Sequence, residues 1–434
     1  MIDPKVCDRM RDDWNSRAGE DANYYVAFGR RDQPEAEFFD TAREVVHGLE
    51  WELKRIPRQR GRACRALEIG CGPGRLMRPM SRHFDEIHGI DVSGEMIRLA
   101  RERLRGIPHA HVQVSSGADL ASFADDSFDF VYSYAVFQHI PSRQVVFQYL
   151  TETRRVLRVG GILRCQLNGL PETAAHYDTW CGVRISGAEI AAFAAERDFQ
   201  LLALEGVSTQ YLWTTWRKRP DGWRTRLAAT KPACEARIRR VTNAHSSEPV
   251  APPRGRFASV SVWVEQLPDD CDLNTLEILV GGKKSLGTYL GPREADGLQQ
   301  VNACLPEGLD TGLQPLELRW LGALIAAPSR LRVIPPAPAV PRVVAVCDGV
   351  DLLSGTKIVS RSLKVTLEEA SEPHRFQASI DGRPVGGIEV FCTDPRPPRH
   401  ELNFKLPDGL GVGAYTLEMR LGPRRFAPVQ IEVA

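Results

Sequence analysis

Three glycines at alternating positions, Gly70, Gly72 and Gly74, separate a short apolar run from a helical pattern. Residues 63–69 are typical of a strand and residues 75–84 of a helix. Glycine permits the positive φ angles of a sharp turn and lets a ligand approach the backbone, while a helix N-terminus presents unpaired N–H groups. The segment therefore predicts a strand–loop–helix unit that can bind a nucleotide-like ligand.

The same alternation of strand and helix patterns continues on both sides of the glycines. We expect further helices at residues 35–53, 93–104, 142–157 and 188–196, and further strands at 87–90, 111–114, 128–133, 161–167, 201–204 and 210–216. This order predicts an α/β Rossmann-like domain with a doubly wound, mostly parallel sheet. Ligands of such sheets bind outside the carboxyl ends of the strands, which places the glycine loop at a ligand-binding rim.

Asp91 ends the second predicted strand, about 20 residues after Gly70. A carboxylate at this place can accept hydrogen bonds from both hydroxyls of a ribose. The glycine spacing is G-x-G-x-G, whereas dinucleotide-binding loops use G-x-G-x-x-G. Glu68, just before the loop, can either fix the loop or face a positive group of the ligand.

These residues resemble the first motif of class I S-adenosylmethionine-dependent methyltransferases, in the form of the type 11 and type 25 domains. The similar segments follow in order along the chain: 67–75 (LEIGCGPGR), 89–93 (GIDVS), 117–120 (GADL), 126–132 (DSFDFVY) and 155–161 (RVLRVGG). They cover about residues 60–168. The resemblance implies that the chain is an enzyme with S-adenosyl-L-methionine as its cofactor.

The resemblance also implies roles for single residues. The cofactor-binding residues would be Glu68, Gly70, Gly72, Gly74, Asp91, Ala118, Asp119 and Ser133. Asp91 would hold the ribose, and Ala118 with Asp119 would contact the adenine. The family more often has its acid directly after the glycine, where this chain has Ala118.

Candidate residues for the acceptor side are less sharply defined. His139 follows the fourth predicted parallel strand and is the first candidate for a general base, with His176 as the alternative; either can instead be structural. Residues 14–25, expected outside any regular helix, and residues 176–184 are candidates for a lid over the site. The tentative substrate residues are Tyr24, Tyr25, Tyr134, Tyr177 and Trp180. No metal is expected, because clustered ligands with suitable spacing are lacking.

Charge and cysteine use limit the partners. The 56 Lys and Arg residues nearly balance the 55 Asp and Glu residues, so nucleic-acid binding is unlikely. No apolar run reaches the roughly 18 residues that a membrane span needs, and the N-terminus lacks a signal-peptide pattern. The ten cysteines contain no C-x-x-C pair, which favours reduced thiols and a cytoplasmic location.

Residues 217–240 carry nine basic and two acidic residues. This surplus of positive charge is typical of a solvated linker or of a surface that steers an anionic partner.

The second half of the chain contains a repeat. At an offset of 101 residues, 305–309 (LPEGL) aligns with 406–410 (LPDGL), and 316–319 (LELR) with 417–420 (LEMR). Short alternating runs between Pro and Gly turns predict two all-β sandwiches, which resemble immunoglobulin-like domains. The expected domains are a methyltransferase domain with an N-terminal lid at 1–220, a basic linker at 221–244, and β-sandwich repeats at 245–337 and 338–434.

The sequence thus predicts a methyltransferase that moves a methyl group to a small-molecule, lipid or sugar-related (glycan) acceptor by in-line displacement. The alternative is a catalytically silent, S-adenosylmethionine-binding or scaffold protein that acts through its β-sandwiches. A nucleotide-dependent oxidoreductase is disfavoured by the glycine spacing. The β repeats can also bind a protein partner or mediate self-association.

Overall fold

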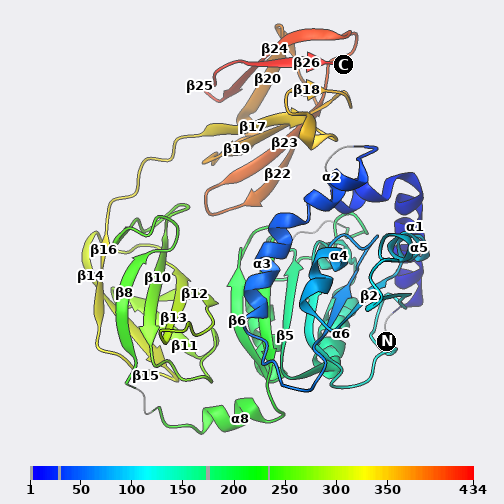
Figure 1. Ribbon diagram of the computed structural model, residues 1–434. Helices are drawn as coiled ribbons and strands as arrows, with labels where there is room; N and C mark the ends of the chain where they lie inside the picture. Colours follow the sequence, from blue (N-terminus) through cyan, green and yellow to red (C-terminus); the bar gives the residue numbers. More distant parts are fainter. Residues whose placement is uncertain (1–2, 28–30, 173–175, 233–234) are drawn as a thin grey trace. The chain divides into compact units, whose positions relative to one another are not determined.

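The computed structural model describes residues 3–27, 31–172, 176–232 and 235–434. The chain divides into two compact units (Figure 1). The first unit comprises Met1–Gly19 and Thr41–Pro336, and the second comprises Glu20–Asp40 and Ala337–Ala434.

The α/β part of the first unit is built on seven strands in the order β3-β2-β1-β4-β5-β7-β6. β1 pairs in parallel with β2 and β4, and the parallel pairing extends to β3 and β5, whereas β7 is antiparallel to both β5 and β6. The predicted doubly wound, mostly parallel sheet is therefore confirmed. Its strands are β1 (Arg65–Ile69), β2 (Glu86–Asp91), β3 (Ala110–Val114), β4 (Phe128–Ser133), β5 (Leu157–Leu167), β6 (Phe199–Glu205) and β7 (Leu212–Lys218).

Helices cover both faces of this sheet because its strands present apolar side chains to both sides. One core joins Ala66 and Phe130 with residues of α3 (Arg43–Leu53), α4 (Met77–Met80) and α5 (Gly94–Arg103). The other core joins Leu67 and Val131 with residues of α6 (Arg143–Val156) and α7 (Gly187–Glu196). Figure 1 shows α3 and α4 on the near side of the sheet.

Two helices differ from expectation. The helix expected at 35–53 is divided into α2 (Glu35–Asp40) and α3, and the one expected at 75–84 is a short α4 followed by a 3-10 turn at Ser81–His83. The first break has a cause in packing, because the Thr41 carbonyl accepts a hydrogen bond from Arg75 Nη1 (3.2 Å). Ser93 is the N-cap of α5, since its Oγ accepts from the Met96 N–H at 3.1 Å.

The expectation that residues 14–25 lie outside a regular helix is wrong, because they belong to α1 (Pro4–Ala27). This helix is interrupted at Asp21, whose backbone angles (φ −166°, ψ 88°) are not helical. Its buried residues before Asp21 are Cys7, Met10 and Ala18, which are widely spaced, so the apolar face that marks a packed helix is weak in the sequence. No helix in the described ranges is both long and apolar enough to cross a membrane.

The first β repeat continues the sheet of the α/β part. Its strands β8 (Arg237–Asn243), β10 (Ser259–Glu265), β13 (Leu298–Cys304) and β12 (Lys283–Leu290) pair in this order. Tyr289 of β12 then pairs with Ala203 of β6. The second layer is β9 (Val250–Ala251), β16 (Ser329–Val333), β14 (Gly312–Trp320) and β11 (Leu276–Val280). Residues 221–244, expected as a linker, include α8 (Trp223–Ala228) and β8.

The second repeat has the same strand order. One sheet is β17 (Arg342–Asp348), β19 (Ser362–Glu368), β23 (Arg399–Lys405) and β22 (Glu389–Asp394). The other contains β18 (Lys357–Ile358), β26 (Val429–Val433), β24 (Gly413–Leu421) and β20 (Phe376–Ile380). Both sheets contribute to one apolar core, so the internal repeat seen in the sequence is a repeat of structure.

Candidate functional site

The glycine loop lies at the carboxyl end of β1. Gly70, Gly72 and Gly74 have φ angles of 72°, 50° and 84°, a region that side-chain-bearing residues rarely adopt. The N–H groups of Gly70 and Cys71 donate to the Ile90 carbonyl at 2.8 and 2.9 Å, which fixes the loop to the end of β2. A Cβ atom on Gly70 would lie 2.3 Å from Val136 Cγ2, so this position has room for glycine alone.

The Asp91 carboxylate joins the glycine loop to the end of β2. Its Oδ2 accepts from the Gly72 N–H and its Oδ1 from the Ser93 N–H, both at 2.9 Å. Burial raises the pKa of this carboxyl to about 6. An ionised carboxylate has about four acceptor sites, so two are left for the hydroxyls of a ribose.

Glu68 lies below the loop as a buried acid, 3% exposed. It accepts a hydrogen bond from the Tyr132 hydroxyl at 2.8 Å. Burial raises its pKa to about 8, so the isolated site holds a proton on Glu68 at neutral pH. A cationic ligand group would favour its ionised form.

The remaining predicted cofactor residues also lie at this rim. Ala118 and Asp119 follow β3, and their N–H groups both donate to Ser116 Oγ at 3.2 Å. Asp119 Oδ1 accepts from the Ala121 N–H at 3.0 Å. Ser133, at the end of β4, is buried and donates to the Ile69 carbonyl at 2.9 Å. The structure thus brings the predicted residues to one edge of the sheet, and their contacts with a cofactor stay predictions.

The first part of α1 packs along the same rim. Asn15 Oδ1 accepts from Ser93 Oγ at 2.8 Å and from the Glu95 N–H at 3.2 Å. Arg17 donates to the carbonyl and the hydroxyl of Thr179 at 3.1 and 3.0 Å. Residues far from one another in the chain are therefore held together over the ends of β2 and β5.

His139 is deeply buried beside this helix, 8% exposed. Its Nδ1 lies 3.0 Å from the Trp180 carbonyl and its Nε2 lies 3.2 Å from Gln138 Nε2, so Nδ1 carries the proton and Nε2 accepts. Its ring meets Trp14 edge-on, with ring centroids 5.5 Å apart. Burial lowers its pKa to about 4, well below the neutral range that suits a general base. Its role as the base stays a prediction.

The other acceptor-side candidates are spread more widely. His176 is exposed, Tyr177 packs partly buried against the core, and Trp180 is 49% exposed. Tyr24 and Tyr25 belong to the second unit, where the Arg31 guanidinium lies 4.0 and 5.0 Å from their ring centroids. Across the part of the chain that the structure describes, no three His, Cys, Asp or Glu residues gather as metal ligands would.

Tyr134 belongs to a row of four side chains that was not predicted from the sequence: Arg75, Tyr134, Trp213 and Arg164. Its ring stacks on Trp213 of β7, with centroids 5.7 Å apart and planes 26° apart. The Arg75 guanidinium carbon lies 5.3 Å from the Tyr134 centroid, and that of Arg164 lies 4.6 Å from Trp213. Arg75 directly follows the last glycine of the loop, which was the one signal available for it.

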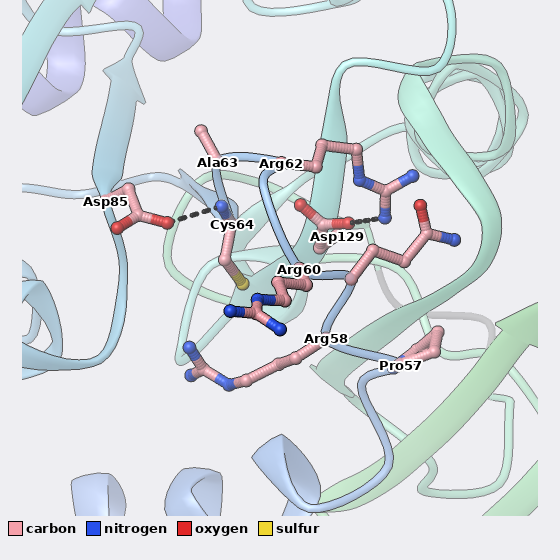
Figure 2. A pocket seen from close by; sticks show the side chains of 9 residues that line it. Pro57, Arg58, Arg60, Arg62, Ala63, Cys64, Asp85 and Asp129 are labelled. Carbon is pink, nitrogen blue, oxygen red and sulfur yellow. Dashed lines mark hydrogen bonds and ion pairs between the residues drawn. The ribbon is translucent and has the colours of Figure 1, made fainter.

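A separate cavity of about 390 Å³ lies at the opposite edge of the sheet. It is lined by residues of the loop that leads into β1, together with Asp85 and Asp129 near the amino ends of β2 and β4 (Figure 2). Arg62 is paired with Asp129 at 2.8 Å, and Arg58 donates to the His83 carbonyl at 2.8 Å. Since Asp91 lies at the other end of β2, this cavity is not the predicted cofactor site.

Comparison with known proteins gives the class of the domain. Residues 67–165 match the family of methyltransferase domains. The chain is 29% identical over 153 residues to phosphoethanolamine N-methyltransferase 2 of Caenorhabditis elegans, a match that covers 33% of this chain and 34% of that enzyme. It is 27% identical over 175 residues to a ubiquinone biosynthesis O-methyltransferase of Xanthomonas oryzae pv. oryzae, covering 36% of this chain and 69% of that enzyme. A solved structure of geranyl diphosphate C-methyltransferase from Streptomyces coelicolor A3(2) is 15% identical, with 49% of this chain and 97% of that chain covered and a TM-score of 0.37.

The α/β part of the chain is therefore an S-adenosylmethionine-dependent methyltransferase domain. Its cofactor is S-adenosyl-L-methionine.

Proposed function

We propose that the whole chain is a methyltransferase that transfers a methyl group to a small-molecule acceptor, with lipid and sugar-related acceptors included. The observation that carries this proposal is the Asp91 carboxylate, which is bonded to Gly72 and Ser93 and retains acceptor sites at the rim. Asp91 would bind the ribose, the glycine loop would pass beside the methionine part, and Ala118 with Asp119 would contact the adenine. The cofactor supplies an activated methyl group on a sulfonium.

In this proposal the protein contributes mainly orientation, which can provide several kcal/mol toward a displacement reaction. Tyr134 and Trp213 would flank the acceptor where β4 and β7 meet the rim. The unprotonated His139 Nε2 can take up a proton only weakly, since the pKa of this ring is about 4. An acceptor that needs little base assistance, such as an amine or a thiol, suits this arrangement better than an unactivated hydroxyl.

An Asp91→Ala variant is expected to bind S-adenosylhomocysteine about 10- to 100-fold more weakly than the wild type, since hydrogen bonds to a charged group are lost. Isothermal titration of both proteins measures this. Asp85→Asn is the matched control, because Asp85 lies just before β2, at the opposite end from Asp91, and bonds the Cys64 N–H at 2.7 Å. Equal affinities of Asp91→Ala and wild type would contradict the ribose assignment, and a wild type that binds NAD but not S-adenosylhomocysteine would contradict the function.

Cofactor affinity is also expected to depend on pH. Because the pKa of Asp91 is raised to about 6, the free site binds a proton below that pH and loses an acceptor for the ribose. Below this pKa the affinity for S-adenosylhomocysteine should fall by up to about tenfold per pH unit, in addition to any pH dependence from Glu68, whose pKa is about 8. Titrations at several pH values measure the slope. An Asp91→Asn variant should bind weakly without this slope, and an unchanged slope in that variant would assign it to another group.

We further propose that the two all-β repeats are immunoglobulin-like sandwiches that bind a protein or glycan partner or mediate self-association. Their matching strand orders and paired sheets support this. A cytoplasmic location is supported by the buried free thiols of Cys7, Cys64, Cys71 and Cys165. Cofactor binding without detectable methyl transfer to any tested acceptor would favour the alternative of a catalytically silent scaffold.

A further inference from the structure

Arg75 is a buried cation at the rim of the methyltransferase domain. Arg75 and Arg55 are the most deeply buried arginines in the described ranges, at 4% and 5% exposure. Arg55 is neutralised by Glu52, whose carboxylate lies 2.6 Å from its Nε. In the part of the chain that the structure describes, Arg75 has no carboxylate within ion-pair distance.

The partners that Arg75 does have are neutral. Its Nη1 donates to the Thr41 carbonyl at 3.2 Å and to the Thr41 hydroxyl at 3.0 Å. Its guanidinium carbon also lies 5.3 Å from the centroid of the Tyr134 ring. The buried Nε has no partner. A buried guanidinium without a counter-ion is costly, so the site is incomplete as it stands.

The nearby acid does not supply the missing charge. Glu68 is the carboxyl group that contributes to the electrostatic field at Arg75, but it lies beyond ion-pair distance and bonds the Tyr132 hydroxyl instead. Burial raises the pKa of Glu68 to about 8, so at neutral pH it is mostly protonated. The positive charge of Arg75 is therefore available to a ligand.

The aromatic neighbours of Arg75 come from the carboxyl-end side of the sheet, where ligands of such sheets bind. Tyr134 directly follows β4, and Trp213 of β7 pairs with Gln166 near the carboxyl end of β5. The stacked rings of Tyr134 and Trp213 thus lie at the rim, beyond Arg75. At the far end of the row, Arg164 is already paired with Glu205 at 3.0 Å, which leaves Arg75 as the unneutralised cation of the row.

We propose that Arg75 binds an oxyanion, a carboxylate or a phosphate, of the methyl acceptor, so that the acceptor is an anionic small molecule. This rests on the proposed function. The guanidinium can bind two oxygens of such a group side by side. It already donates hydrogen bonds to two oxygens of Thr41, the carbonyl and the hydroxyl. The stacked rings of Tyr134 and Trp213 would contact the uncharged part of the acceptor. The same chemistry is offered by the methionine carboxylate of the cofactor, and the experiment separates the two sources.

The test uses the full-length protein saturated with S-adenosylhomocysteine and titrated with malonate or inorganic phosphate as the oxyanion probe. We expect the wild type to bind at least one probe and Arg75→Gln to bind it at least tenfold more weakly. Arg75→Lys keeps the positive charge but lacks the paired N–H donors, so its affinity for the probe should lie between those of the wild type and Arg75→Gln. This variant tests the proposal if Arg75→Gln fails to fold. Arg78→Gln, which removes an exposed charge one turn away on α4, should behave as the wild type.

A second titration compares S-adenosylhomocysteine with methylthioadenosine, which lacks the methionine carboxylate. We expect Arg75→Gln to change both affinities by less than about twofold. A selective loss of S-adenosylhomocysteine binding would assign Arg75 to the cofactor and overturn the proposal, as would equal probe binding by wild type and variant, or no probe binding by the wild type. Failure of the wild type to bind S-adenosylhomocysteine would instead contradict the proposed function. In that case the probe is titrated without cofactor, and weaker binding by Arg75→Gln than by the wild type would still support the oxyanion site.

Discussion

Replacement of Gly70 by alanine is expected to lower the affinity for S-adenosylhomocysteine by at least about 100-fold. The reason is that the loop must move to relieve a strain of about 3 kcal/mol. The added Cβ would lie 2.3 Å from Val136 Cγ2, on a residue with a φ of +72°. Loop displacement would break the bonds of the Gly70 and Cys71 N–H groups to Ile90, which hold the loop beside Asp91. Isothermal titration measures the affinity, and thermal unfolding of the same samples separates lost binding from lost folding.

Two variants make this result specific. Gly48→Ala places a methyl group within α3 where nothing lies within 4 Å, and it should bind normally with unchanged or slightly higher stability. Val136→Ala combined with Gly70→Ala removes the steric contact but leaves the unfavourable φ, so it should recover only part of the loss. Wild-type affinity in Gly70→Ala alone would show that the loop is not fixed as described.

The glycine loop and Asp91 could be predicted from the sequence because their requirements are local. A positive φ at Gly70, a carboxylate at the end of β2 and the Ser93 cap each depend on a few neighbouring residues. The mostly parallel sheet was predicted from the same local signals, since alternating strands and helices leave few ways to form a sheet.

The features that the sequence did not reveal depend on contacts between distant residues. α1 packs on the apolar core through Cys7 and Met10, and its first part is also held at the rim by Asn15 bonding Ser93 and Arg17 bonding Thr179. The break at Thr41 and the row that includes Arg75 have the same origin, because Thr41, Arg75 and Trp213 are brought together only by the folded sheet and its helices. Patterns of hydrophobic spacing carry no information on such polar contacts.

The joint between the methyltransferase domain and the first β repeat is a further example of distant polar contacts. Gln200 Nε2 donates to the carbonyls of Asp269 and Cys271, both at 2.7 Å, and the Leu273 N–H donates to the Leu201 carbonyl at 2.9 Å. Arg224, in the basic segment after β7, is ion-paired with Asp272 at 2.7 Å. Part of the local positive charge is thus used within the fold rather than presented to a partner.

Asp272→Ala is expected to lower the free energy of unfolding of the first unit by about 3 kcal/mol, the lower end of the cost of breaking a buried ion pair because Arg224 is partly exposed. The Asp272 side chain is 0% exposed and that of Arg224 is 20% exposed. The variant also removes acceptors for the Thr275 N–H and hydroxyl, at 3.0 and 2.7 Å.

Urea unfolding followed by tryptophan fluorescence measures the change, since Trp223 lies in the same joint and bonds Asp270. Asp269→Ala is the matched control: its carboxylate is 86% exposed and its partner Arg293 is 41% exposed, so a change of at most about 0.5 kcal/mol is expected. Equal stabilities of Asp272→Ala and Asp269→Ala would mean that the β repeat is not held to the methyltransferase domain through this pair.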